Sequence, residues 1–178
     1  LGTQSSPGPD IYRYHYENFV LRVIGIVDRA HRLVGAALLL DRKKFEGTTG
    51  NQYVQQQIKS DAELSMALRG VVQAVKSYKG PRNELIHAAA FNTPELGLFL
   101  TVHQVGLDVG DIDVDGLARE HFAQGGKEIA MTIVQLETLL ATLLDVLAPQ
   151  FSTAAAHEDR APRNASNETS SDVDDPRT

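Results

Sequence analysis

Tyr78-Lys79-Gly80-Pro81-Arg82-Asn83-Glu84-Leu85-Ile86-His87 is the stretch that decides how this chain folds. Glycine commonly ends a helix and proline is tolerated in a first helical turn, so Gly80 and Pro81 predict a break followed by a new short helix. Arg82 lies in the first turn of that helix, and His87 follows five positions later. At about 100° per residue, their side chains lie about 140° apart around the axis, so one straight helix does not present both on a single face.

Apolar residues at helical spacing precede this stretch. A helix is predicted from Ile11 to Leu40, with Asp10 as its cap and with two neighbouring apolar stripes. The first stripe comprises Tyr16, Val20, Val23, Val27, Ala30, Val34 and Ala37, and the second comprises Phe19, Ile26, Leu33 and Leu40. So wide an apolar face indicates burial on two sides, either wholly in the domain's own core or partly against a partner helix.

Two further helical segments flank the central stretch. Residues 52–78 form one pattern, interrupted near Ser60-Asp61, where Asp61 caps the later part. Its stripe comprises Leu64, Leu68, Val71, Val75 and Tyr78. After the central stretch, Thr93-Pro94-Glu95 combines a capping side chain, a first-turn proline and an acidic residue, which predicts a short helix ending near residue 103.

The last helix is predicted over residues 114–149, with a weak point at Gly125-Gly126. Its stripe comprises Ile129, Ile133, Leu136, Leu140, Leu143 and Leu147, widened by Leu139, Leu144 and Val146. Long, wide-striped helices with short connections, and no alternation typical of strands, predict an all-α fold, an up-and-down bundle of four to five helices.

The chain has 178 residues, which is enough for one domain with a sizeable core. We expect a flexible leader over residues 1–10, the helical bundle over 11–152 and a disordered acidic tail over 153–178. The net charge is −6, of which −3 lies from residue 157 onward. The body is therefore mildly acidic, and any contact with RNA is expected to be local.

The composition also limits the chemistry. The absence of cysteine excludes disulfides and thiolate metal sites and fits a cytoplasmic protein. Residues 1–10 lack the basic start and apolar centre expected of a secretory signal, and no apolar run reaches the roughly 18 residues that span a membrane. No two histidines have the helical spacing of a metal site, and the acidic loop 106–116 lacks the EF-hand spacing, so we expect no metal and no cofactor. Histidines other than His87 are interpreted as exposed residues or as core residues bonded to a carbonyl.

Arg82, Asn83 and His87 together resemble the R-x4-H motif of HEPN domains, small helical domains that include metal-independent ribonucleases of toxin and defence systems. The resemblance, over roughly residues 12 to 150, implies a HEPN-like bundle and an endoribonuclease that acts as a homodimer, with both motifs at a shared cleft. His87 would act as general base or acid, Arg82 would hold the scissile phosphate, and Asn83 would orient one of these groups.

Basic residues near the motif are candidates for binding a substrate phosphate. Lys76 and Lys79 lie close to Arg82 in the sequence, and these three residues form the only basic cluster that we connect with RNA. Arg42-Lys43-Lys44 has two interpretations: cations that offset the negative end of the first helix, which is favoured, or a further phosphate-contacting patch.

The alternative function is a non-catalytic helical dimerisation or interaction module, paired with a partner such as a nucleotidyltransferase or an antitoxin. A scaffold bundle unrelated to the HEPN family is a third alternative. In a purely structural role, Arg82 would form a surface ion pair with Glu84 or Glu95, and His87 would be a half-buried residue packed on the bundle.

Overall fold

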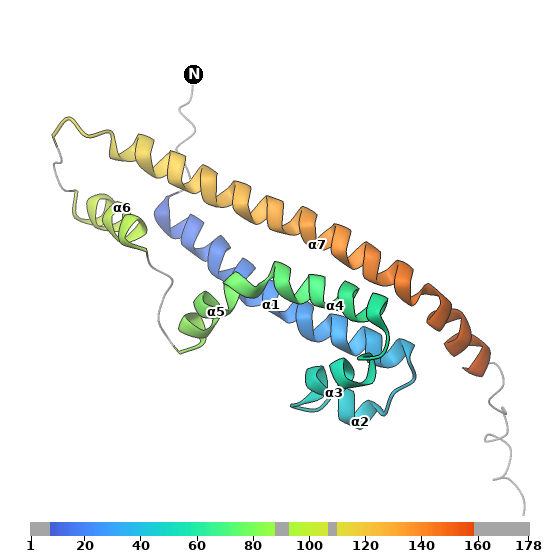
Figure 1. The fold of residues 1–178 in the computed structure, drawn as a ribbon. Coiled ribbons are helices and arrows are strands. Elements are labelled where there is room, and N and C mark those ends of the chain that lie inside the picture. The colour runs from blue at the N-terminus through green and yellow to red at the C-terminus, as the bar shows by residue number, and fades with distance from the viewer. Residues whose placement is uncertain (1–7, 88–92, 107–109, 159–178) are drawn as a thin grey trace, which may run out of the picture.

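The computed structural model describes residues 8–87, 93–106 and 110–158, with side chains described as far as residue 153 (Figure 1). These parts of the chain form seven α-helices, one 3-10 helix and no strand. The all-α prediction is confirmed, although the helices outnumber the predicted four to five. The elements are α1 (Pro9–Ala37), α2 (Arg42–Phe45), α3 (Gly50–Gln57), α4 (Ala62–Ala74), η1 (Lys76–Tyr78), α5 (Lys79–Ile86), α6 (Pro94–Val105) and α7 (Val114–Glu158).

Three long helices, α1, α4 and α7, form the body of the molecule (Figure 1). α1 and α7 run in the same direction, since Tyr12 stacks on Phe122 near their starts and Ala37 lies beside Pro149 towards their ends. α4 runs opposite to both (Figure 1). The short helices α2 and α3 connect α1 to α4, and α5 and α6 connect α4 to α7, so the extra helices lie in the two connections.

The core lies where the apolar stripes of the three long helices meet. The predicted stripes of α1 and α4 are confirmed, because their valines and leucines are almost fully buried. The second predicted stripe (Phe19, Ile26, Leu33 and Leu40) is half-buried and packs against this core, although Leu40 lies beyond the end of α1. The buried core residues of the long helices are Val20, Val23, Val27, Ala30, Val34, Ala37, Leu64, Ala67, Leu68, Val71, Leu136, Leu143 and Leu147.

The first helix ends earlier than predicted. α1 stops at Ala37, and Leu39 adopts a φ of 53°, a left-handed conformation that turns the chain. The Asp41 side chain then accepts a hydrogen bond from the Lys43 N–H and caps a separate helix, α2. The interpretation of residues 42–44 as cations at the end of the first helix is therefore wrong, because they form α2 themselves.

The predicted cap at Asp10 is wrong, because α1 begins at Pro9 after Gly8 and Asp10 lies within its first turn. Two other helix boundaries follow the predicted caps. The Asp61 side chain accepts a hydrogen bond from the Leu64 N–H at 3.0 Å and begins α4. The Thr93 hydroxyl accepts from the Leu96 N–H at 3.1 Å and begins α6. Both cap predictions are confirmed, and the break between α3 and α4 lies next to the predicted position.

The last helix is longer than predicted and is not interrupted. α7 continues through Pro149 to Glu158, so it includes residues assigned to the tail. It is also continuous at Gly125, where a Cβ atom would collide with the Tyr12 hydroxyl of α1. Gly125 therefore allows α1 and α7 to approach closely within an unbroken helix. The remainder of the predicted tail and most of the predicted leader lie outside the described residues.

Candidate functional site

The motif lies on α5, but the local structure differs from the prediction. α5 begins at Lys79 and follows η1 directly, so Gly80 is inside a helix and does not end one. Pro81 is the third residue of α5, where its missing N–H has no intrahelical partner to lose. The predicted break before Pro81 is therefore wrong; the change of helix type occurs at Tyr78.

Tyr78 anchors the motif segment to the body. Its hydroxyl hydrogen-bonds the Thr132 hydroxyl of α7 at 2.9 Å, and its ring packs edge-on against Phe19 of α1 at 5.2 Å. Val75, just before η1, is fully buried. The start of α5 is consequently held by two long helices, which can position the residues that follow.

The three motif residues lie at the surface of α5. Arg82 is half-buried, and its Nη1 donates to the Asn83 Oδ1 at 3.4 Å. His87 is exposed and caps the end of α5, with its backbone N–H donating to the Asn83 carbonyl at 3.1 Å. The structure thus brings Arg82 and Asn83 together, whereas His87 follows one and a half turns later.

Neither structural role expected for the motif is found among the described residues. Arg82 forms no ion pair with Glu84 or Glu95 there, and His87 is exposed. No side chain of α5 or η1 is fully buried. The exposed Lys76 and Lys79 lie on the same continuous segment. An arginine, an amide, an imidazole and two ammonium groups are suited to binding a phosphate and moving a proton. η1 supplies Lys76, the other four groups lie on α5 or at its end, and all five side chains are half-buried or exposed.

A second candidate site is the outer face of α7, an uncovered surface that sequence reasoning missed. Next to the core stripe runs a second stripe with the same alternating steps of four and three. Its members are all exposed: Ala123, Lys127, Ala130, Val134, Glu137, Ala141, Leu144, Ala148 and Phe151. Alanine contributes little to a hydrophobic pattern, so the larger apolar residues of the core stripe dominate the pattern of this helix and the outer stripe is not recognised. We call this set the outer stripe.

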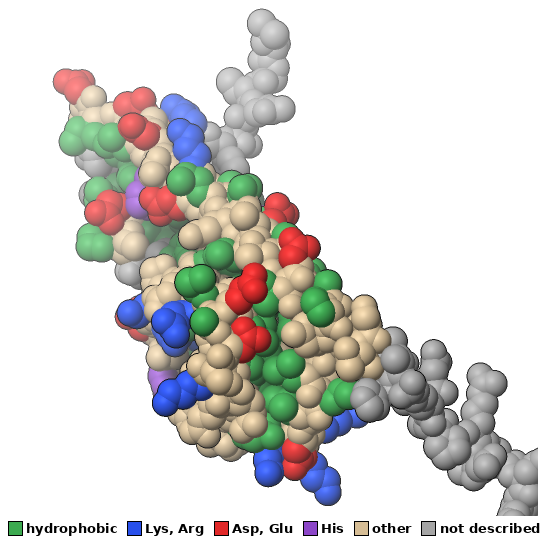
Figure 2. Space-filling model, turned by 45° about the vertical axis from the view of Figure 1, so that its right-hand side comes forward, with side chains coloured by type: hydrophobic (Ala, Val, Ile, Leu, Met, Phe, Trp, Pro, Cys, Tyr) green, Lys and Arg blue, Asp and Glu red, His purple; other side chains and the backbone are tan. Residues whose placement is uncertain are grey.

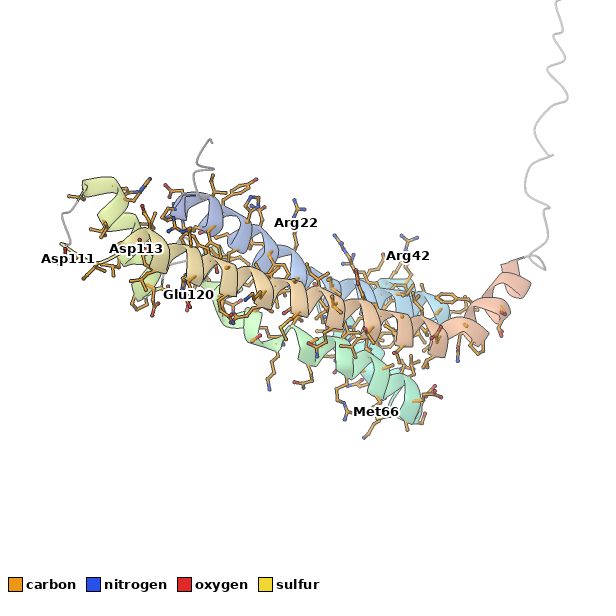
Figure 3. The ribbon with its side chains drawn as sticks, turned by 90° about the horizontal axis from the view of Figure 1, so that it is seen from above. Arg22, Arg42, Met66, Asp111, Asp113 and Glu120 are labelled. Atoms are coloured by element: carbon orange, nitrogen blue, oxygen red, sulfur yellow. The ribbon has the colours of Figure 1, made fainter. Side chains whose placement is uncertain are left out.

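The surroundings of α7 explain why the outer stripe is exposed. Figure 3 shows α1 and α4 flanking α7, with Arg22 of α1 pointing away on one side and Met66 of α4 on the other. No described element covers α7 from the viewer's side in that picture. Val134 is 62% exposed and Leu144 is 46% exposed, although both are large apolar residues within a long helix. Hydrophobic side chains also reach the surface between acidic ones along the body (Figure 2).

An apolar pocket adjoins the N-terminal part of the outer stripe. It has a volume of about 450 Å³ and lies between the starts of α1 and α7. Its lining is Ile11, Tyr12, His15, Tyr16, Arg119, Phe122, Ala123, Gly126 and Ile129. Burial raises the pKa of Tyr12, and burial together with the neighbouring Tyr78 raises the pKa of Tyr16 to about 12. Both phenols therefore stay neutral, and the pocket favours an apolar occupant.

Other features have a structural explanation. Buried His31 bonds the Val27 carbonyl through Nδ1 at 2.7 Å and the Gln55 amide through Nε2 at 3.0 Å, so the expected core histidine bonded to a carbonyl is present here. Burial lowers its pKa. Lys43 and Lys44 border a separate pocket of about 420 Å³ beside α3, away from α5 (Figure 1). The phosphate-contacting alternative for residues 42–44 is thus not connected with the motif.

Residues 114–153 of α7 are long and apolar enough, by length and composition alone, to cross a membrane. Uninterrupted apolar runs do not reveal this segment, because polar and charged residues are interspersed along it. The core helices of soluble proteins meet the same criterion, but only 11% of the most apolar window is buried here. Glu137 and Asp145 are exposed within this segment, and carboxylates are costly in a bilayer.

Comparisons with protein-family models, with curated proteins and with solved structures found no match for this chain. The HEPN resemblance therefore depends on the motif residues alone.

Proposed function

We propose that this protein is a helical dimerisation module that binds a second copy of itself through the outer face of α7. The observation that supports the proposal is the outer stripe, in which apolar residues at coiled-coil spacing remain in water along a helix whose other face forms the core. Exposed apolar surface of this length is rare in monomers and marks interaction sites.

Molar mass by light scattering after gel filtration tests this proposal. Val134→Asp places a charge in the centre of the outer stripe and should reduce dimer formation. Met66→Asp is the matched control, since Met66 is 70% exposed on α4, away from that face. A wild-type protein that stays monomeric, or equal effects of the two substitutions, would contradict the proposal.

The exposed motif on α5 favours a second candidate function, the metal-independent endoribonuclease that the HEPN resemblance implies. Its support is that His87 is exposed and that, among the described residues, half-buried Arg82 forms neither of the ion pairs expected of a structural role. In this candidate, Asn83 orients the reacting groups, and Lys76 and Lys79 hold further phosphates. This second candidate function also includes a HEPN-like bundle, a cytoplasmic role in a toxin or defence system, and an antitoxin or nucleotidyltransferase partner.

The shared cleft of that candidate requires α5 of two copies to meet. α5 and the outer face of α7 lie on different sides of α1 (Figure 1), so α7 pairing and a shared α5 cleft are separate contacts. RNA cleavage in EDTA tests the candidate, with His87→Ala and Arg82→Ala beside wild type. Cleavage that both substitutions abolish, while the variants stay folded, is the expected result; cleavage that persists in His87→Ala would exclude His87 as the proton-transfer group.

A further inference from the structure

The outer stripe carries two charged residues of opposite sign, Lys127 and Glu137, separated by ten positions on one exposed face. Parallel in-register pairing with a second α7 would place lysine opposite lysine and glutamate opposite glutamate. Both contacts are repulsive at the centre of an interface. In contrast, an antiparallel pair centred at residue 132 places each Lys127 opposite the Glu137 of the other copy.

We propose that two copies pair through α7 in this antiparallel register, an inference that rests on the dimer of the proposed function. The alternating steps of four and three residues give the stripe two kinds of position, which follow each other in turn. In an antiparallel pair, each position of one kind faces a position of the other kind, and this register meets that requirement. Ala130 then faces Val134 of the second copy, and Ala123 faces Ala141. A shift by one heptad in either direction preserves the apolar spacing but places Glu137 opposite Glu120 or Val134, so it loses the charge pairing.

The small residues of the outer stripe fit close helix pairing. Four of the six layers between residues 123 and 141 contain an alanine, from positions 123, 130 and 141, and small side chains let two helix backbones approach each other. The paired segment from residue 123 to 141 is about 28 Å long at 1.5 Å per residue. The Lys127–Glu137 contact occurs twice by symmetry, once on either side of the centre at residue 132.

The apolar pocket supplies the remaining complementarity. The two-fold axis that relates the two copies is perpendicular to both α7 helices and to the line that joins them. Rotation about this axis leaves α1 of both copies on the same side of the helix pair. In this register Leu144 reaches position 120 of the second copy, next to Arg119, which lines the pocket. The 46% of Leu144 that is exposed would enter an apolar wall that includes Ile11 and Phe122. The pocket is therefore part of the interface with the second copy.

Charge reversal with rescue tests this register. Lys127→Glu and Glu137→Lys each create two like-charge contacts by symmetry, so each should weaken dimerisation at least about tenfold, corresponding to about 1.4 kcal/mol. The double variant Lys127→Glu/Glu137→Lys restores opposite charges and should return the dissociation constant to within about threefold of wild type. Sedimentation velocity over a concentration series measures all four proteins.

The outcomes separate this register from the dimer itself. A wild-type protein that remains monomeric overturns both the dimer and the register. A wild-type dimer that is unaffected by either reversal, or a double variant weaker than both single ones, overturns the register and leaves dimerisation standing. Rescue in the double variant supports the register, since a merely structural role of either charge would not be restored by exchanging them.

Cysteine crosslinking gives an independent measurement, because the natural chain contains no cysteine. Ala130→Cys/Val134→Cys places two thiols opposite each other twice in the proposed dimer, so mild oxidation should yield a covalent dimer. Ala130→Cys alone should not, whereas parallel in-register pairing would place its two thiols opposite each other. Met66→Cys on the outer side of α4 is the control and should remain monomeric under the same conditions. Equal crosslinking of the double variant and of Met66→Cys would contradict the register.

Discussion

Replacing Leu143 and Leu144 separately with alanine compares the two faces of α7 with one chemical change. Leu143 is fully buried between α7 and the other long helices, whereas Leu144, its neighbour, is 46% exposed on the outer stripe. Both substitutions remove three carbon atoms from the same helix, so differences in helix propensity cancel.

The expected costs differ because of burial. At about 0.8 kcal/mol for each buried carbon, Leu143→Ala loses about 2.4 kcal/mol of transfer free energy. The cavity left in the core raises the loss in unfolding free energy to about 3–4 kcal/mol. About half of Leu144 is already in water, so Leu144→Ala should cost the monomer about 1 kcal/mol.

Urea unfolding followed by circular dichroism measures both losses, at a protein concentration low enough to keep the chain monomeric. At higher concentration, the cost of Leu144→Ala should increase, because a dimer stabilises the folded state by mass action. Equal losses for the two variants at low concentration would refute the assignment of an inner and an outer face to α7.

Three further predictions concern the monomer. Burial lowers the pKa of His31 below its ordinary 6.5, so the unfolded chain takes up the proton more readily than the folded one. The contribution of neutral His31 to folding stability is complete above about pH 6.5 and declines as the pH falls through the folded pKa. The urea midpoint of His31→Leu should therefore fall less on acidification than that of the wild type. Asp61→Ala should lower the unfolding free energy by about 1 kcal/mol through loss of the α4 cap, with Asp61→Asn as a milder control in the same urea assay. Gly125→Val should lower the melting temperature through collision with Tyr12, whereas Gly126→Val, with open space around it, should have a smaller effect; equal effects would contradict the contact.

Local sequence signals predicted much of the fold because they act over a few residues. The caps at Asp61 and Thr93 and the stripes of α1 and α4 are confirmed, since capping and helical spacing require no knowledge of distant contacts. The predicted break at Gly80 is wrong, and the packing role of Gly125 was not predicted. Glycine has several uses, and only the tertiary structure shows that Gly125 accommodates Tyr12.

The candidate sites were predictable to different degrees. Arg82, Asn83 and His87 could be selected from their order in the sequence, and their exposure on α5 depends on how Tyr78 attaches that segment to α1 and α7. The outer stripe was not found, because the sequence alone does not show which of two adjacent helical stripes faces the core. Only the positions of α1 and α4 beside α7 distinguish them (Figure 3).

Sedimentation equilibrium of the wild-type chain across a wide concentration range tests most directly whether α7 binds a second copy. The account predicts that the apparent mass rises from 19.4 kDa towards twice that value, and that Val134→Asp abolishes the rise. A mass that stays at 19.4 kDa at every concentration, or a rise that Val134→Asp leaves unchanged, would contradict it.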